Sequence, residues 1–164
     1  MRAAMILGTA LMLAGCGHLP FGRRAASRGG ETITYRALPT GFCLSCAGYT
    51  ITLGPDGQGI FTGERNTVVV GDRRFAASLD AVRAFTSRLR EYRPTGEVLM
   101  TGPPFCKIVS TDQNTVDIRW QGVEGRPPHL TFYGGCDVEK NRKMAAALFS
   151  APSLLPIADL VGAH

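Results

Sequence analysis

Two cysteines three positions apart stand immediately before the clearest hairpin pattern in the chain. Cys43 and Cys46 precede residues 49–53, in which apolar residues alternate with threonines. Apolar residues at every second position predict a strand with one buried face. Residues 54–57 (Gly-Pro-Asp-Gly) form a turn signal, because proline presets φ and glycine accepts positive φ. Residues 58–62 then return as the partner strand. The chain is therefore constrained to a β-rich domain that opens with a tight cysteine loop.

The start of the chain has the layout of a bacterial export signal. Arg2 is followed by an apolar run, residues 3–13, and the segment closes with Leu13-Ala14-Gly15-Cys16. The run is shorter than the roughly 20 residues of a membrane span. The last four residues resemble the lipobox of bacterial lipoproteins, in which the peptide is cut before the cysteine and the sulfur is diacylated. We therefore expect residues 1–15 to be a signal peptide and Cys16 to carry a lipid anchor, with each buried CH₂ contributing about 0.8 kcal/mol. An ordinary secretory signal is the alternative.

Residues 16–31 show no hydrophobic period and predict a flexible tether, which as a random coil spans roughly 20 Å. Arg23, Arg24 and Arg28 would lie beside anionic headgroups, and a solvated linker explains them equally well. Gly17 follows Cys16, so the aspartate that retains lipoproteins at the inner membrane is absent. This favours the outer membrane, facing the periplasm. The net charge of +5 then fits contact with anionic lipid better than a nucleic-acid partner.

Residues 32–164 predict one globular domain, because 45% hydrophobic and 19% charged residues are ordinary for a folded chain. Periodicity predicts strands at 32–36, 49–53, 58–62, 64–71, 115–121 and 129–133, and helices at 78–92 and 138–149. The order β-β-β-β-α-β-β-α predicts an α+β fold, an antiparallel sheet with two helices on one face.

Some local expectations accompany this fold. The strand at 64–71 contains three consecutive valines and should be buried on both faces, whereas residues 72–74 should turn and residues 95–104 should form a loop. Ser78 and Asp137 are the expected N-caps of the two helices. Residues 154–157 are too apolar to remain exposed and should pack on the core.

Four cysteines remain once Cys16 is set aside: Cys43, Cys46, Cys106 and Cys136. An even number in an oxidising compartment favours disulfides, and three pairings are open. The predicted hairpin brings Cys136 near residues 112–115, so Cys106 reaches it only if residues 105–111 bend as a loop. That bridge would contribute about 3–4 kcal/mol.

Three hypotheses compete for Cys43 and Cys46. A redox-active pair normally lies at the N-terminus of a helix, whose dipole lowers the thiol pKa, but Ala47, Gly48 and a β-branched run follow here. A zinc site would need all four sulfurs, and the other two cysteines form no second metal-binding knuckle. A structural disulfide is the favoured hypothesis.

The same stretch resembles a bacterial family catalogued as domain of unknown function 6438. The resemblance is carried by Cys43, Cys46, Tyr49, Ile51, Asp56-Gly57, Gly63 and Thr111-Asp112, and extends from about Thr32 to Phe149. The family motif is similar to C-F-G-x-C-P-x-Y; here the cysteines are one residue closer and Ala47 replaces the proline. Many relatives resemble lipoproteins and lack counterparts of Cys106 and Cys136, which implies two independent pairs, Cys43–Cys46 and Cys106–Cys136. The resemblance implies fold and location but no activity.

The sequence predicts no catalytic residue, metal site or cofactor. His129 is the one histidine inside the predicted domain apart from the chain's last residue, and its position at a strand start favours a surface or structural role. Asp112 and Asp117 are explained as a turn residue and a strand-edge residue. The sequence contains no serine-hydrolase elbow, paired-histidine zinc motif or phosphate loop.

These observations favour a non-enzymatic, lipid-anchored periplasmic protein that binds or supports another envelope component. One alternative is a thiol–disulfide oxidoreductase that uses Cys43 and Cys46. A second alternative is an inhibitor of a periplasmic hydrolase, which rests on small size and an exposed stapled loop.

Overall fold

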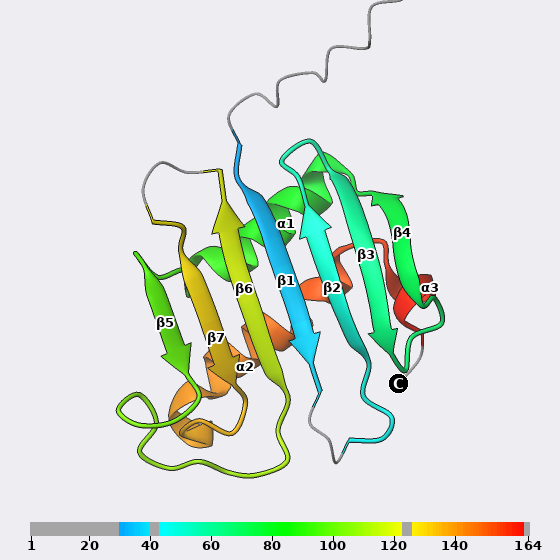
Figure 1. Cartoon of the computed structure of the whole chain (residues 1–164). Coiled ribbons are helices and arrows are strands. Elements are labelled where there is room, and N and C mark those ends of the chain that lie inside the picture. The colour runs from blue at the N-terminus through cyan, green and yellow to red at the C-terminus, as the bar shows by residue number, and fades with distance from the viewer. Residues whose placement is uncertain (1–29, 40–42, 123–125, 163–164) are drawn as a thin grey trace, which may run out of the picture.

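The strands of this chain form one seven-stranded sheet in the order β4-β3-β2-β1-β6-β7-β5 (Figure 1). The computed structural model describes residues 30–39, 43–122 and 126–162. Cys16, the predicted signal peptide and almost all of the predicted tether lie outside these residues. The strands are β1 Thr32–Leu38, β2 Gly48–Leu53, β3 Gln58–Arg65, β4 Gly71–Ala76, β5 Glu97–Met100, β6 Thr115–Gln121 and β7 His129–Tyr133.

Neighbouring strands are antiparallel except β5, which pairs parallel to β7. Two long helices, α1 (Leu79–Arg90) and α2 (Val138–Ser150), lie on one face of the sheet (Figure 1). A 3₁₀ turn, η1 (Ala151–Leu154), and a short helix, α3 (Ala158–Val161), complete the described chain. The predicted α+β class is therefore confirmed. No helix within the described ranges is both long enough and apolar enough to cross a membrane.

The core lies between the sheet and the helices, because every second strand residue faces α1 and α2. Phe85 and Leu89 of α1 and Leu148 of α2 are fully buried there. The Tyr35 hydroxyl lies inside this layer and donates to the Leu148 carbonyl at 3.2 Å. Burial raises the pKa of Tyr35 well above its usual value, so the phenol stays neutral. From the sheet, the buried side chains are Ile33, Tyr35, Ile51, Leu53, Phe61, Val116, Ile118, Trp120, Leu130 and Phe132.

The prediction of a strand at residues 64–71 is wrong, because most of this segment is a loop between β3 and β4. β3 continues to Arg65, Asn66 then takes a positive φ of 51°, and the valines form a loop with Val68 70% and Val70 75% exposed. The N–H groups of Val68 and Val69 donate to the carbonyls of Val161 and Leu160, so this run pairs with α3 instead of joining the sheet. Residues 72–74, predicted as a turn, belong to strand β4. Charged residues suit β4 because it is an edge strand.

Strand β5 was also missed, since residues 95–104 were expected to form a loop. Its four residues are too few to show a period, and its parallel pairing with β7 is long-range. The other elements follow the prediction closely. β6 and β7 have the predicted bounds, and Ser78 caps α1 by accepting from the N–H of Ala81. Leu155 and Ile157 are buried, as expected for the C-terminal apolar stretch.

Candidate functional site

Both cysteine pairs lie at one end of the sheet. This is the end at which β1, β3, β5 and β7 finish and β2, β4 and β6 begin (Figure 1). The described loops there are 43–47, 66–70, 101–114 and 134–137. We call these loops together the disulfide-bearing end. The opposite end holds the start of β1, where the chain enters the domain.

Cys43 and Cys46 form a disulfide with a Cα–Cα distance of 5.4 Å. The loop between them is held from the side by the β3–β4 connection. The Asn66 amide donates to the carbonyls of Leu44 and Cys46, and the Arg65 guanidinium donates to the carbonyl of Cys43. The Leu44 side chain, 85% exposed, projects from this fixed backbone.

The position of this disulfide bears on the redox hypothesis. After Cys46 the chain runs into strand β2, which begins at Gly48, instead of into a helix. The helix dipole that lowers the thiol pKa in redox-active pairs is therefore missing here. The Asn114 amide lies 3.6 Å from the Cys46 sulfur and joins this loop to the long loop 101–114. The geometry around Cys43 and Cys46 therefore supports a structural disulfide.

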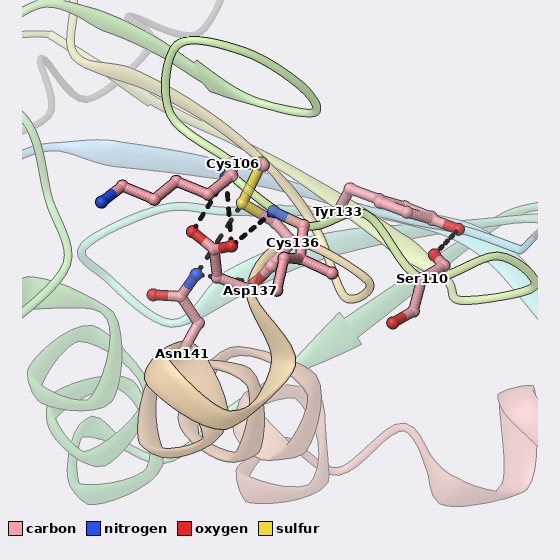
Figure 2. Close-up of a disulfide and its surroundings, with 8 residues drawn as sticks. Cys106, Ser110, Tyr133, Cys136, Asp137 and Asn141 are labelled. Carbon is pink, nitrogen blue, oxygen red and sulfur yellow. Dashed lines mark hydrogen bonds between the residues drawn. A yellow bond between two sulfur atoms is a disulfide. The ribbon is translucent and has the colours of Figure 1, made fainter.

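Cys106 and Cys136 form the second disulfide (Figure 2). Cys106 is 1% exposed and Cys136 is fully buried. Its Cα–Cα distance is 5.1 Å and it closes a separation of 30 residues. As the sequence required, the segment around residues 105–111 bends as a loop, and an isolated β-bridge joins its Val109 to Cys136. The four domain cysteines thus form two disulfides, which confirms the expectation of disulfide bonding.

Asp137 does not cap α2 with its side chain, contrary to the sequence prediction. Its backbone takes a positive φ of 41°, and its carboxylate accepts from the N–H groups of Ile108 at 2.7 Å and Lys107 at 3.0 Å (Figure 2). These two backbone hydrogen bonds lower the pKa of Asp137 below its usual 3.8. The residue therefore binds the long loop to the start of α2 beside the disulfide. The Asn141 amide adds a bond to the Cys136 carbonyl at 2.7 Å.

Further along, Tyr133 fixes the same loop. Its hydroxyl donates to the Ser110 carbonyl at 2.8 Å (Figure 2). The same hydroxyl accepts from the N–H of Gln113, and the N–H of Ser110 donates to the Gly135 carbonyl. Between this loop and the first turn of α2 is an open groove of about 810 Å³. The groove was invisible to sequence reasoning, because its two walls come from segments thirty residues apart.

Exposed apolar side chains gather at the disulfide-bearing end. Eleven large apolar side chains are exposed among the described residues, and seven of them belong to this end or to the adjoining first residue of α2. A single exposed apolar side chain is ordinary, but several that gather at one end of a domain favour an interaction surface. The seven are Leu44, Val68, Val70, Phe105, Ile108, Val109 and Val138.

A cluster of polar side chains around His129 lies on the helix-free face of the sheet. Both ring nitrogens of His129 face carboxylates, Nδ1 at 2.9 Å from Glu97 and Nε2 at 2.6 Å from Asp117. Both ring nitrogens thus contact carboxylates of the two neighbouring strands. The residue therefore ties β5 and β6 to β7, in line with a structural role. Burial alone would raise the pKa of Asp117, but hydrogen bonds from His129, Thr131 and Arg119 lower it overall.

No protein-family model matches the chain, and no curated protein matches it either. Within the described residues, no group of three or more His, Cys, Asp and Glu side chains is placed to hold a metal ion. The function must therefore be inferred from the site itself, which is a rigid and partly apolar surface.

Proposed function

We propose that this protein is a lipid-anchored envelope protein of the periplasm that binds another envelope component through its disulfide-bearing end. The observation that carries the proposal is the gathering of seven exposed apolar side chains at the end of the sheet where both disulfides lie. A binding module needs such a surface, because rigid loops lose little conformational entropy when a partner docks.

The direction of the chain supports this arrangement. Residues 30 and 31 enter β1 beside Gly122, at the end of the sheet away from both disulfides (Figure 1). A lipid on Cys16 would therefore hold that end toward the bilayer through the tether. The seven residues of β1 add about 23 Å before the chain reaches the disulfide-bearing end. That end would face the periplasm, where a protein partner is accessible.

The resemblance to domain of unknown function 6438 agrees with the proposed location, since many members of that family resemble lipoproteins. It adds no activity. Leu44, at the tip of a loop closed by a disulfide, also favours a second candidate function, inhibition of a periplasmic hydrolase, because a projecting side chain on a rigid loop suits an enzyme's specificity pocket.

Position-specific photo-cross-linking in growing cells tests the proposed function. A photo-reactive phenylalanine at Leu44, Val68 or Ile108 should give discrete adducts. The same residue at Leu79, an exposed apolar position at the opposite end, should give none. Adducts that are equal at both ends, or absent at the three loop positions, would contradict the proposal.

The lipid anchor is tested separately with an alkyne-bearing fatty acid. The full chain should incorporate the label, and Cys16→Ser should not. Labelling that persists in the variant would mean that Cys16 is not the lipid attachment site. For the inhibitor candidate, the adduct at Leu44 should contain a hydrolase, and Leu44→Asp should relieve inhibition of that enzyme.

A further inference from the structure

The groove between the loop 106–113 and the first turn of α2 has two apolar walls. Ile108 on the loop is 71% exposed and Val138 on the helix is 42% exposed, and both line the space of about 810 Å³. Ser110 and Gln113 line it as well and offer hydrogen-bonding groups. The groove can accept an aliphatic side chain together with a stretch of polar backbone.

The walls of the groove cannot collapse onto each other. The Cys106–Cys136 disulfide joins the base of one wall to the base of the other, and the Asp137 carboxylate holds the N–H groups of Lys107 and Ile108 (Figure 2). The N–H of Asp137 in turn donates to the Ile108 carbonyl. Ile108 is therefore kept in water by a backbone that has little freedom to bury it. Such preorganisation lowers the entropy cost of binding.

The charges around the groove favour an acidic ligand. Lys107 and Lys140 line it together with Asp137 and Glu139. Both lysines attract the Asp137 carboxylate, although neither forms a direct ion pair with any residue that the structure describes. The Asp137 carboxylate keeps its negative charge while it accepts two backbone hydrogen bonds, so the two lysines and the two carboxylates of the lining balance. Exposed Arg142 and Lys143 follow on α2 and leave an excess of positive charge on this side.

We propose that this groove binds an extended acidic segment of a partner protein. An aliphatic side chain of the segment packs between Ile108 and Val138, and flanking carboxylates pair with Lys107 and Lys140. The proposal rests on the proposed function, which places this end away from the bilayer. That placement favours a protein segment over the headgroups of an anionic membrane.

A phage library of random dodecapeptides, selected on the full lipidated chain in phosphatidylcholine nanodiscs, tests this directly. Selection should enrich peptides that combine Asp or Glu with Leu, Ile or Val. Ile108→Asp should weaken the enriched peptides about tenfold, and the charge reversal K107E/K140E should weaken them similarly and remove the salt dependence. Leu79→Asp and Arg83→Glu, which change exposed residues of α1, are matched controls and should bind normally. Ile108→Ser provides a milder variant if Ile108→Asp alters the circular dichroism spectrum.

Several outcomes would overturn the proposal: no enrichment above empty nanodiscs, enrichment of basic or uncharged peptides, or binding that survives Ile108→Asp. Hydrogen exchange in phosphatidylglycerol nanodiscs tests whether the groove binds a membrane instead of a protein. Protection of residues 107–113 there, but not in phosphatidylcholine, would assign the lysines to lipid and overturn the protein partner. If the peptide tests fail but the cross-links at Leu44 and Val68 are still observed, the groove proposal is wrong and the proposed function is retained.

Discussion

On the helix-free face of the sheet, one carboxylate accepts hydrogen bonds from three side chains. Asp117 is 8% exposed and accepts from Thr131 at 2.8 Å and from Arg119 at 3.2 Å, and His129 lies 2.6 Å away. A carboxylate in this setting stabilises the folded state only while it is ionised. Its contribution should therefore depend on pH in a defined direction.

Asp117→Asn should lower the free energy of unfolding at pH 7 by about 1–3 kcal/mol, because hydrogen bonds to a charged acceptor are lost. The folded-state pKa of Asp117 lies below its usual 3.8. The carboxylate's stabilisation is thus fully present above about pH 4 and is lost as pH falls through the folded-state pKa. Urea unfolding at pH 7 and pH 3 should show the difference between wild type and variant shrinking in acid. Asp112→Asn, at an exposed loop position, is the control and should change little at either pH; a difference for Asp117→Asn that is independent of pH would contradict the assignment.

Gly63 shows how tightly the β3–β4 connection is packed. A Cβ atom built there would lie 1.8 Å from the Val69 carbonyl oxygen, and the atom it meets is backbone. Gly63→Ala should therefore destabilise the fold by about 1–3 kcal/mol, as overpacked sites do. Gly102→Ala is a matched control, because a Cβ atom there meets nothing within 4 Å. Thermal unfolding followed by circular dichroism compares the two, and equal melting temperatures would show that the connection can shift without cost.

At the scale of elements, the two disulfides differ in accessibility. Cys106 and Cys136 are buried, whereas Cys43 and Cys46 are partly exposed on a loop of the surface. A reductant must reach a sulfur atom to attack it. The two bridges should therefore open in a fixed order under native conditions.

With increasing dithiothreitol at neutral pH, the Cys43–Cys46 bridge should open first, and alkylation followed by mass spectrometry should identify it. Replacing Cys106 and Cys136 with alanine should cost about 3–4 kcal/mol, because the bridge closes a long loop, while the same change at Cys43 and Cys46 should cost less. Simultaneous opening of both bridges would mean that the loops unfold together. Opening of Cys43–Cys46 at a mild glutathione poise would revive the oxidoreductase alternative.

The hairpin β6–β7 was predictable because its apolar residues alternate and its two strands are neighbours in the chain. The valine run was mispredicted for the opposite reason. Its hydrophobicity suits a buried strand, but the N–H groups of Val68 and Val69 pair with residues of α3 nearly a hundred positions away. The short strand β5 likewise depends on a partner, β7, that no local signal identifies.

The features of the candidate site also differ in whether the sequence could predict them. The cysteines could be predicted to form disulfides from their number and setting, and the loop around residues 105–111 followed from the hairpin register. The groove could not, because Asp137 resembles an ordinary N-cap in sequence and only the fold turns its carboxylate toward Lys107 and Ile108. The exposure of Ile108 and Val138 is likewise a property of the packed domain and of no single segment.

For the whole molecule, the two ends of the sheet have separate roles. One end receives the chain at the start of β1 (Figure 1). The other end carries both disulfides, the apolar loops and the groove. An anchor at the first end would leave the second free, since β1 alone spans about 23 Å. The proposed lipid on Cys16, acting through a tether of similar reach, would therefore bias the domain toward this orientation on a bilayer.

This orientation can be measured with a fluorophore attached at either end of the domain. Gln121→Cys places the label near the start of β1 and Val68→Cys places it on the disulfide-bearing end; both positions are exposed. In nanodiscs that contain a nitroxide-headgroup lipid, the label at 121 should be quenched more strongly than the label at 68, because quenching falls steeply with distance. Cys16→Ala should abolish quenching at both positions by releasing the chain. Stronger quenching at 68 would place the disulfide-bearing end against the membrane, and the apolar loops would then have to be reassigned from a protein partner to the lipid surface.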